Sequence, residues 1–289
     1  MLKIEKILLI ILKKYIVTIY PHAKINIGLS VIGKRPDGFH DIETVFYPIP
    51  LCDTLKIETS ENGMAGKLNF TCDGIALPDD GLNENLCCKA YHLLDADYRL
   101  PPANIHLHKV IPVGAGLGGG SSDAAYTLKV LNDLFQLRIS DEELANYASR
   151  IGSDCTFFLQ RSPAFGTGKG DILEPISLSL AEYRIILVKP PVFVSTAEAY
   201  ASVVPKKVVH HLPELLQAPV NEWRHTVFND FEDSVCKKFP EIGRIKEKLY
   251  HEGAIYASMS GSGSSVYGIF QESPGNIAKM FPGCFVWNN

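Results

Sequence analysis

The sequence lacks any excess of positive charge, since 28 Lys and Arg stand against 32 Asp and Glu, giving a formal net charge of −4. This balance argues against a broad basic face for nucleic acid. Anionic ligands would instead be held locally, by backbone amides and a few lysines. Internal repeats, low-complexity tracts and long runs of like charge are also missing. The remaining composition, 46% hydrophobic and 21% charged, is ordinary for a globular chain of about two domains.

Cysteine is scarce and irregularly spaced. The seven cysteines include no C-x-x-C pair and stand at positions 52, 72, 87, 88, 155, 236 and 284. We therefore expect free thiols in a reducing cytoplasm rather than a disulfide framework or a zinc site. The histidines at 106 and 108 and at 210 and 211 come in pairs without a third ligand, so we expect no metal site built from them.

Hydrophobic runs long enough to cross a membrane are absent. The run ILLIIL, residues 7–12, is too short to span a bilayer and is followed by Lys13 and Lys14. Its basic start is typical of a signal peptide, but no small-residue cleavage site follows. We expect residues 1–14 to be an extension that packs on the body or frays from it, without stable membrane association. The alternative is a surface helix that contacts a membrane or a partner.

The most informative segment is GAGLGGGSSDAA, residues 114–125. It follows a predicted strand over 104–113 and opens a predicted helix, so bare backbone amides and a helix N-terminus would form an anion site. Gly114, Gly116 and Gly119 satisfy the dinucleotide pattern G-x-G-x-x-G, but the βαβ unit that this pattern requires is missing. No Lys-Ser or Lys-Thr follows the last glycine, which argues against a P-loop. A phosphate loop of another kind is the preferred interpretation, and a flexible loop is the alternative.

Periodicity predicts an α+β fold in which helices pack on mostly antiparallel sheets. Strands are expected over 15–32 and in TVFYPI, DTLKIET, KLNFTC, YRIILVKP, AIYASMS and SSVYGIF. A helix is expected from Asn83–Asn85 to Leu94, and another after the glycines, with Ser121 and Ser122 as its caps. A third begins at Ser140, which forms a capping box with Glu143. Further helices are expected from Ser195 and around 240–250. SPAFGTGKGD, residues 162–171, is expected to be a loop. The domain boundary is placed after it, with an N-terminal domain over 1–172 and a C-terminal domain over 173–289.

Three segments together resemble the GHMP superfamily of kinases, named after galactokinase and the homoserine, mevalonate and phosphomevalonate kinases. PVGAGLGGGSSDAA looks like its central ATP loop, residues 21–49 like its N-terminal motif, and MSGSGSSVYGIF (259–270) like its C-terminal glycine motif. The resemblance covers residues from about 20 to 270. It implies a ribosomal protein S5 domain 2-like N-terminal domain and a ferredoxin-like C-terminal domain. AKIN followed by KRPDGFH is similar to the members that act on a cytidine diphosphate sugar alcohol.

The resemblance also implies a reaction. ATP and Mg²⁺ would be the cosubstrates, and the γ-phosphoryl group would pass to a tertiary hydroxyl of a small-molecule substrate. Asp154 matches the family's aspartate and is the candidate base, while Lys24 matches its lysine and would keep Asp154 ionised. From the residues alone, Asp154 would more often be a turn residue and Lys24 a solvated strand lysine.

Binding residues follow from the same match. The loop residues expected to hold the polyphosphate are Gly114, Gly116, Leu117, Gly118, Gly119, Gly120, Ser121 and Ser122. The residues expected on the adenine side are Lys109, Asn85 and Leu86, and those expected to bind the acceptor are Asn26, Phe39, His40 and Tyr200. A cytosine would stack between Phe39, where the family more often has tyrosine, and Tyr200. Without the resemblance, both aromatics read as ordinary core residues and Asn26 as a strand-end residue.

Two other functions stay open at this point. The chain could be a GHMP kinase that acts on homoserine, mevalonate or a sugar, although RPDGFH argues against this. It could also be a catalytically silent ATP-binding sensor on the same fold, although Lys24 and Asp154 argue against that. The sequence leaves open whether the protein is a monomer or a homodimer, and whether Asp123 faces the nucleotide.

Overall fold

The computed structural model describes residues 15–59, 67–77, 85–201, 203–205 and 210–289. The expected extension 1–14 lies outside these residues. The chain forms two compact units, and each unit combines segments that are distant in sequence. The first unit holds the chain up to Ala23 together with Cys52–Val113 and Gly118–Arg161, and the second holds Lys24–Leu51, Gly114–Leu117 and Ser162–Asn289. A continuous boundary at residue 172 stays a prediction.

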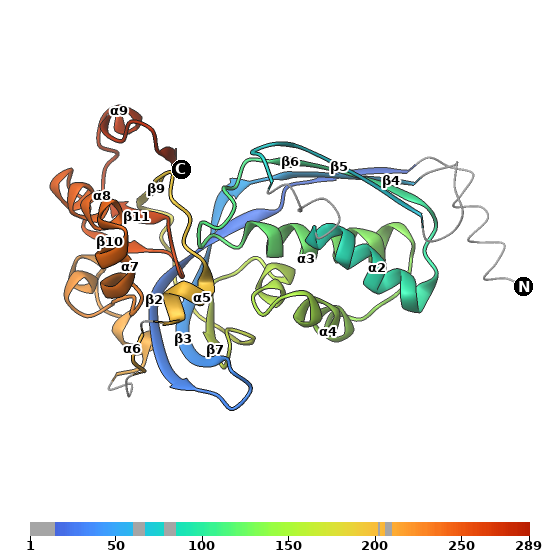
Figure 1. Ribbon diagram of the computed structural model, residues 1–289, viewed down its shortest axis with the longest axis horizontal. Coiled ribbons are helices and arrows are strands. Elements are labelled where there is room, and N and C mark those ends of the chain that lie inside the picture. Colours follow the sequence, from blue (N-terminus) through green and yellow to red (C-terminus); the bar gives the residue numbers. More distant parts are fainter. Residues whose placement is uncertain (1–14, 60–66, 78–84, 202, 206–209) are drawn as a thin grey trace, which may run out of the picture. The chain divides into compact units, whose positions relative to one another are not determined.

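The first unit is a four-stranded sheet with helices on one face (Figure 1). The strand order is β1 (Ile16–Ile19), β4 (Thr54–Thr59), β6 (Ala103–Lys109), β5 (Leu68–Gly74). Pairing is antiparallel except between β5 and β6, which run parallel. The helices are α2 (Leu86–Tyr98), α3 (Gly119–Leu134) and α4 (Asp141–Ile151), followed by the short 3₁₀ helix η1 (Cys155–Leu159). The helix α3 packs against both α2 and α4, and its residues from Ser122 to Leu128 are all buried.

Local sequence signals account for most of these helix ends. Ser140 and Glu143 form the predicted capping box of α4, and Asn85 caps α2 by accepting a hydrogen bond from the amide of Cys87 at 2.9 Å. The predicted caps of α3 are wrong. The helix begins at Gly119, its N-cap is Gly118 in the left-handed region at φ +68°, and no side chain caps it. The first-turn amides of α3 are therefore left for another partner.

The second unit contains two four-stranded sheets. One has the order β2 (His22–Lys34), β3 (His40–Cys52), β7 (Ala164–Thr167), β8 (Ile172–Pro175). The other has the order β10 (Tyr256–Met259), β11 (Val266–Phe270), β9 (Arg184–Lys189), β12 (Phe285–Asn288). Its helices are α5 (Thr196–Ala201), α6 (Leu212–Leu215), η2 (Val220–His225), α7 (Glu232–Lys238), α8 (Pro240–His251) and α9 (Ile277–Met280).

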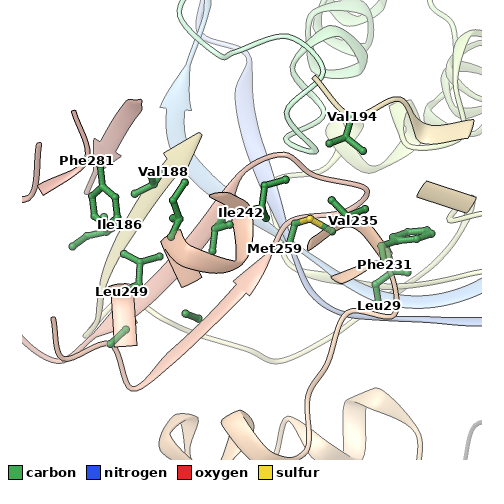
Figure 2. Packing of buried hydrophobic residues seen from close by; sticks show 14 of the residues in the cluster. Leu29, Ile186, Val188, Val194, Phe231, Val235, Ile242, Leu249, Met259 and Phe281 are labelled. Carbon is green, nitrogen blue, oxygen red and sulfur yellow. The ribbon is translucent and has the colours of Figure 1, made fainter. Parts of the chain in front are cut away.

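A continuous apolar core holds the second unit together (Figure 2). Ile186 and Val188 of β9, Ile242 and Leu249 of α8 and Met259 of β10 are all buried in it. The two helical residues are seven positions apart and therefore share one helix face. Burial of each such side chain contributes about 1.5–3 kcal/mol, so this core fixes β10 and the glycine turn that follows it.

One expectation for the second unit needs correction, and one strand of it was missed. SPAFGTGKGD is not a loop but contributes β7 and the tight turn 168–171 that leads into β8. Gly168 and Gly170 sit in the turn at positive φ, where the hairpin needs them, so glycine content misled the interpretation. The edge strand β12 was not predicted. None of the helices in the described part of the chain is long and apolar enough to cross a membrane.

Candidate functional site

The glycine loop is fixed in the second unit by its carbonyl groups. The carbonyl of Ala115 accepts from the amide of Ser265 at 3.2 Å, and that of Leu117 accepts from the amide of Lys24 at 3.0 Å. The carbonyl of Gly116 accepts from Lys24 Nζ at 2.8 Å and from Ser260 Oγ at 2.8 Å. Ala115 and Leu117 are buried, whereas Gly114 and Gly116 are half-buried. The side chains of Ala115 and Leu117 and the carbonyls of residues 115–117 thus face the protein.

The amides of the same loop have no such partners. In the part of the chain that the structure describes, the amides of Gly116, Leu117 and Gly118 donate no hydrogen bond. They lead directly into the uncapped first turn of α3. Unpaired amides followed by a helix N-terminus form an anion site without a net positive charge. This is the arrangement that the glycine content predicts.

Gly116 is required at its position for two reasons. Its φ is +75°, and a Cβ there would lie 2.0 Å from the carbonyl oxygen of Ser260. Any side chain would therefore push the loop away from the C-terminal glycine motif. This contact explains in steric terms why two glycine-rich segments, about 140 residues apart, occur in one chain.

Lys24 and Asn26 form the polar centre of the second unit. Lys24 is 5% exposed, and its ammonium donates to Asn26 Oδ1 at 2.5 Å as well as to Gly116. Asn26 in turn donates from Nδ2 to Thr44 Oγ1 at 2.9 Å, and its backbone amide donates to Ser260 Oγ at 3.1 Å. Strand alternation placed Lys24 and Asn26 on one face, and the structure agrees. Both faces of this part of β2 are buried, so Lys24 is not the solvated lysine that the strand pattern alone suggested.

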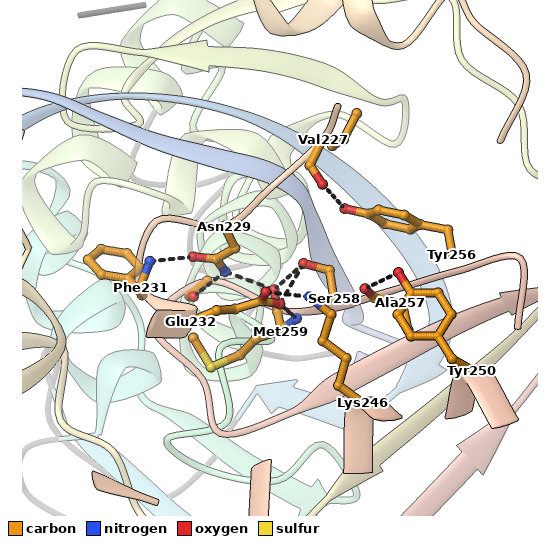
Figure 3. A network of polar contacts seen from close by, with 11 residues as sticks. Val227, Asn229, Phe231, Glu232, Lys246, Tyr250, Tyr256, Ala257, Ser258 and Met259 are labelled. Atoms are coloured by element: carbon orange, nitrogen blue, oxygen red, sulfur yellow. Dashed lines mark hydrogen bonds and ion pairs between the residues drawn. The ribbon is translucent and has the colours of Figure 1, made fainter. Parts of the chain in front are cut away.

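The C-terminal glycine turn is held by residues that the sequence did not single out (Figure 3). Asn229 donates from Nδ2 to the carbonyls of Met259 and Gly261, both at 2.8 Å, and accepts from the amide of Phe231 at 3.0 Å. Glu232 Oε1 accepts from the amide of Met259 at 2.7 Å. These bonds fix the turn that carries Ser260. Neither Asn229 nor Glu232 lies in a recognisable motif, so no sequence signal marked them.

Asp154 lies in the first unit at the N-cap of η1 and makes no cap hydrogen bond with its side chain. It is half-buried, and within its own unit its carboxylate makes no hydrogen bond or ion pair with the described residues. The carboxylate lies close to Gly152 and beside the buried Cys155. It is thus free to accept a proton, while its pairing with Lys24 stays a prediction.

Ser121 and Ser122 differ in their surroundings. Ser121 is half-buried and its Oγ lies near Gly152. Ser122 is fully buried, and its Oγ has no hydrogen-bond partner among the described residues. Of the two hydroxyls, Ser121 is therefore the better placed for a bound ligand.

Lys109 forms a buried ion triad that the sequence did not predict. Its ammonium lies 2.5 Å from Asp53 Oδ2 and 2.8 Å from Asp123 Oδ2, and all three side chains are at most 3% exposed. Asp53 Oδ1 also accepts from the amides of Val110 and Ile111, at 2.6 and 2.8 Å. The triad therefore joins the end of β6, where the loop begins, to the first turns of α3. A nucleotide contact of Lys109 stays a prediction.

The orientation of Asp123, open from sequence, is now defined within the first unit. Its Oδ2 accepts from Lys109, and its buried Oδ1 has no hydrogen-bond partner among the residues that the structure describes. Burial raises the pKa of Asp123 to about 8, against the opposing effect of Lys109. Burial alone would lower the pKa of Lys109, but the two carboxylates outweigh it and raise that pKa.

The aromatic residues expected at the acceptor lie together in the second unit. His40 and Tyr200 stack with ring centroids 4.7 Å apart and an angle of 22° between the rings. Tyr200 also packs edge-on against Phe231 at 4.7 Å, which anchors it to the core. Phe39 is 55% exposed, and Lys169 Nζ lies 4.8 Å from its ring centroid. An exposed phenyl ring next to His40 in the sequence can stack on an aromatic ligand.

Asn85 and Leu86, expected on the adenine side, lie at the start of α2. Asn85 is the cap of this helix. The Leu86 side chain lies next to Gly120, since a Cβ there would be 3.5 Å from Leu86 Cδ1. Both residues are thus close to the first turn of α3, and their contact with a nucleotide stays a prediction.

Comparison with known proteins gives consistent matches over most of the chain. The profile of the GHMP kinases N terminal domain matches residues 85–161, and that of the GHMP kinases C terminal domain matches residues 210–285. The 4-diphosphocytidyl-2-C-methyl-D-erythritol kinase of Bacteroides thetaiotaomicron is 53% identical over 253 residues, which cover 87% of this chain and 91% of the relative. The enzyme of the same name from Parabacteroides distasonis is 50% identical over 93% of this chain and 97% of its own length.

Solved structures agree with these matches. A crystal structure of 4-(cytidine 5'-diphospho)-2C-methyl-D-erythritol kinase superposes with a TM-score of 0.78 at 31% identity, covering 94% of this chain and 98% of the other. The mevalonate kinase of Methanococcus jannaschii superposes with a TM-score of 0.69 at 13% identity, covering 95% of this chain and 98% of that one. The second likeness concerns the fold alone.

Proposed function

Because the chain belongs to the 4-diphosphocytidyl-2-C-methyl-D-erythritol kinase family of GHMP kinases, we propose that it phosphorylates the 2-hydroxyl of 4-diphosphocytidyl-2-C-methyl-D-erythritol with ATP. This step belongs to the non-mevalonate route to isoprenoids. The observation that carries the proposal is the glycine loop, in which the carbonyls of Ala115, Gly116 and Leu117 accept hydrogen bonds while the amides of Gly116, Leu117 and Gly118 donate none to the described residues.

Residues 114–122 would hold the polyphosphate of ATP. The loop fits this group, because the amides of Gly116, Leu117 and Gly118 donate no hydrogen bond to the described residues and a Cβ at Gly116 could not be accommodated. Mg²⁺ would be bound chiefly through phosphate oxygens, since Mg²⁺ keeps several waters and needs few protein ligands. When bound, it would neutralise charge on the transferred group. Lys109, Asn85 and Leu86 are assigned to the nucleotide side, with Lys109 acting from its buried triad.

Asp154 is assigned as the base that accepts the proton of the attacking hydroxyl. Its carboxylate has no competing partner among the described residues of its own unit, which supports this role. Lys24 would place a positive charge at the same reacting group while it holds the carbonyl of Gly116. Lys24 would then determine both the position of the glycine loop and the positive charge at the reacting group.

Phe39, His40 and Tyr200 are assigned to the cytosine of the acceptor, and Asn26 is assigned to a hydrogen bond with the acceptor or with phosphate. Stacking on an exposed aromatic ring is tolerant of the base, and a hydrogen bond from His40 would read its edge. Phe39 replaces the hydroxyl-bearing tyrosine that is commoner in the family and keeps its ring. We place the protein in a reducing cytoplasm, in agreement with seven free cysteines, and leave its state as a monomer or homodimer open.

The decisive experiment measures ADP release with ATP and Mg²⁺ and each acceptor in turn. We expect turnover with 4-diphosphocytidyl-2-C-methyl-D-erythritol and none with homoserine or mevalonate. Turnover with one of the latter only would establish another GHMP kinase, and no turnover with any acceptor would favour the silent sensor.

Asp154→Asn tests the base in the same assay. It should lower kcat by at least about 100-fold with an unchanged melting temperature, because general base catalysis contributes 10²–10⁴. Asp133→Asn is the matched control, since Asp133 is an exposed aspartate of the same unit, and it should turn over like wild type. Equal turnover by both variants would show that Asp154 is not the base.

A further inference from the structure

The exposed ring of Phe193 lies against the first residue of the glycine loop. A Cβ on Gly114 would lie 2.3 Å from Cε2 and 2.6 Å from Cδ2 of Phe193, so the ring fills the space that a side chain at Gly114 would occupy. Both residues belong to the second unit. Phe193 is 64% exposed, which is ordinary for a single apolar residue on a surface. The contact with the loop, rather than the exposure, distinguishes this ring.

The chain on both sides of Phe193 is fixed. Val194 is 2% exposed and belongs to the apolar core (Figure 2), and Val192 packs against the same core. The carbonyl of Val192 also accepts from Ser264 Oγ at 2.8 Å and from Lys189 Nζ at 3.2 Å. Phe193 therefore lies between two anchored residues, and its ring is held in place although it is largely exposed.

The glycine loop needs a support at Gly114. Ala115, Gly116 and Leu117 are held through their carbonyls. By contrast, neither the amide nor the carbonyl of Gly114 makes a hydrogen bond to any residue that the structure describes. Its φ of +59° is a conformation that glycine enters and leaves freely. Packing of the Phe193 ring on Gly114 restricts this freedom before a ligand arrives, so less of it has to be lost on binding.

We propose that Phe193 is a positioning residue of the nucleotide site, which holds the start of the glycine loop in the geometry that receives the polyphosphate. The ring acts through the backbone of the loop, because it contacts the loop at Gly114. The amides of residues 116–118 follow within four positions, so a shift of Gly114 displaces them as well. The inference rests on the proposed function and adds a residue outside the three segments that resemble the family.

Phe193→Ala tests the contact through nucleotide binding. Calorimetry measures the affinity of the full-length protein for a non-hydrolysable ATP analogue with Mg²⁺, and ADP release gives the KM values for ATP and for the acceptor. Phe193→Ala should weaken binding of the analogue and raise the KM for ATP on the order of tenfold, because a small misplacement of binding groups has a large effect. The KM for the acceptor should stay unchanged, since Tyr200 is anchored separately by Phe231. Phe193→Tyr keeps the ring and should behave like wild type.

Variants at Gly114 identify the ring as the partner of the loop. Gly114→Ala should weaken binding of the analogue more than Phe193→Ala does, because its Cβ meets the ring and its φ is strained. The double variant of Gly114→Ala and Phe193→Ala removes the collision and should bind the analogue more tightly than Gly114→Ala alone. Phe228→Ala is the matched control, since Phe228 is 56% exposed in the same unit. It should leave the affinity unchanged and should not relieve Gly114→Ala.

Three outcomes would overturn the inference. Wild-type affinity of Phe193→Ala for the analogue would show that the ring does not position the loop. An equal rise of both KM values, with a lower melting temperature, would show that the variant disturbs the whole segment up to Tyr200. Failure of Phe193→Ala to relieve Gly114→Ala would show that the Cβ does not meet this ring. If wild type binds no analogue and phosphorylates no proposed acceptor, the proposed function itself is refuted, which separates that failure from the other three.

Discussion

Replacement of Lys109 by methionine should destabilise the first unit strongly. Methionine keeps the approximate length of the side chain but removes the ammonium that lies 2.5 Å from Asp53 and 2.8 Å from Asp123. The buried carboxylate of Asp53 is then left without a counter-charge. Asp123 adds no second orphaned charge at neutral pH, because burial raises its pKa to about 8. Asp53 keeps its bonds to the amides of Val110 and Ile111 but remains a buried charge.

The magnitude follows from this uncompensated charge. Removal of one partner from a buried ion pair costs about 3–5 kcal/mol, and protonation of Asp123 puts the expected loss near the lower end. A domain of this size loses about 2–4 °C in melting temperature per kcal/mol. The expected shift is therefore on the order of 10 °C. The destabilisation should also affect the glycine loop, because Asp53 fixes the two residues that lead into this loop. The KM for ATP should therefore rise as well.

Thermal unfolding and urea titration measure the effect. Lys56→Met is the matched control, since Lys56 lies on a strand of the same sheet, is 44% exposed and is 3.6 Å from Glu58. It should change the free energy of unfolding by less than about 0.5 kcal/mol. Adding Asp53→Asn to Lys109→Met should recover part of the loss, because it removes the orphaned charge. A Lys109→Met protein as stable as the Lys56→Met control would refute the reasoning.

Three further predictions follow from single contacts. Gly116→Ala should lower kcat/KM for ATP at least tenfold, because its Cβ would meet the Ser260 carbonyl. Gly283 has a φ of +78° with open space around it, so the control variant Gly283→Ala should cost only backbone strain. Equal activities of the two variants would contradict the steric argument. Asp123 has a folded-state pKa above its unfolded value, so its contribution to stability is present at low pH and is lost as pH rises toward about 8. Urea titrations at several pH values should therefore show wild type falling relative to Asp123→Asn by on the order of 1 kcal/mol per pH unit in that interval, and parallel curves would argue against the raised pKa. Asn229→Ala should cost about 2–4 kcal/mol in the free energy of unfolding, since it removes three buried hydrogen bonds, and a loss below about 1 kcal/mol would show that the glycine turn does not depend on it.

Local patterns in the sequence predicted many of the helices and strands correctly. The capping box at Ser140 and the cap at Asn85 are decided within four residues, so they could be read directly. The strand alternation around Lys24 and Asn26 is equally local. In residues 168–171 the glycines form a tight turn rather than a loop. Glycine content does not distinguish the two, so the hairpin of β7 and β8 was missed.

The sequence by itself determined the kinds of element, the glycine loop and the types of group available for catalysis, because backbone preference and side-chain chemistry are properties of short segments. Only the tertiary structure decided that the carbonyl of Gly116 bonds to Lys24 and Ser260, and that Lys109 lies between Asp53 and Asp123. Each of these contacts joins residues between 14 and 144 positions apart. Such partners are chosen by the packing of whole sheets and helices, which leaves no trace in the spacing of residues along the chain.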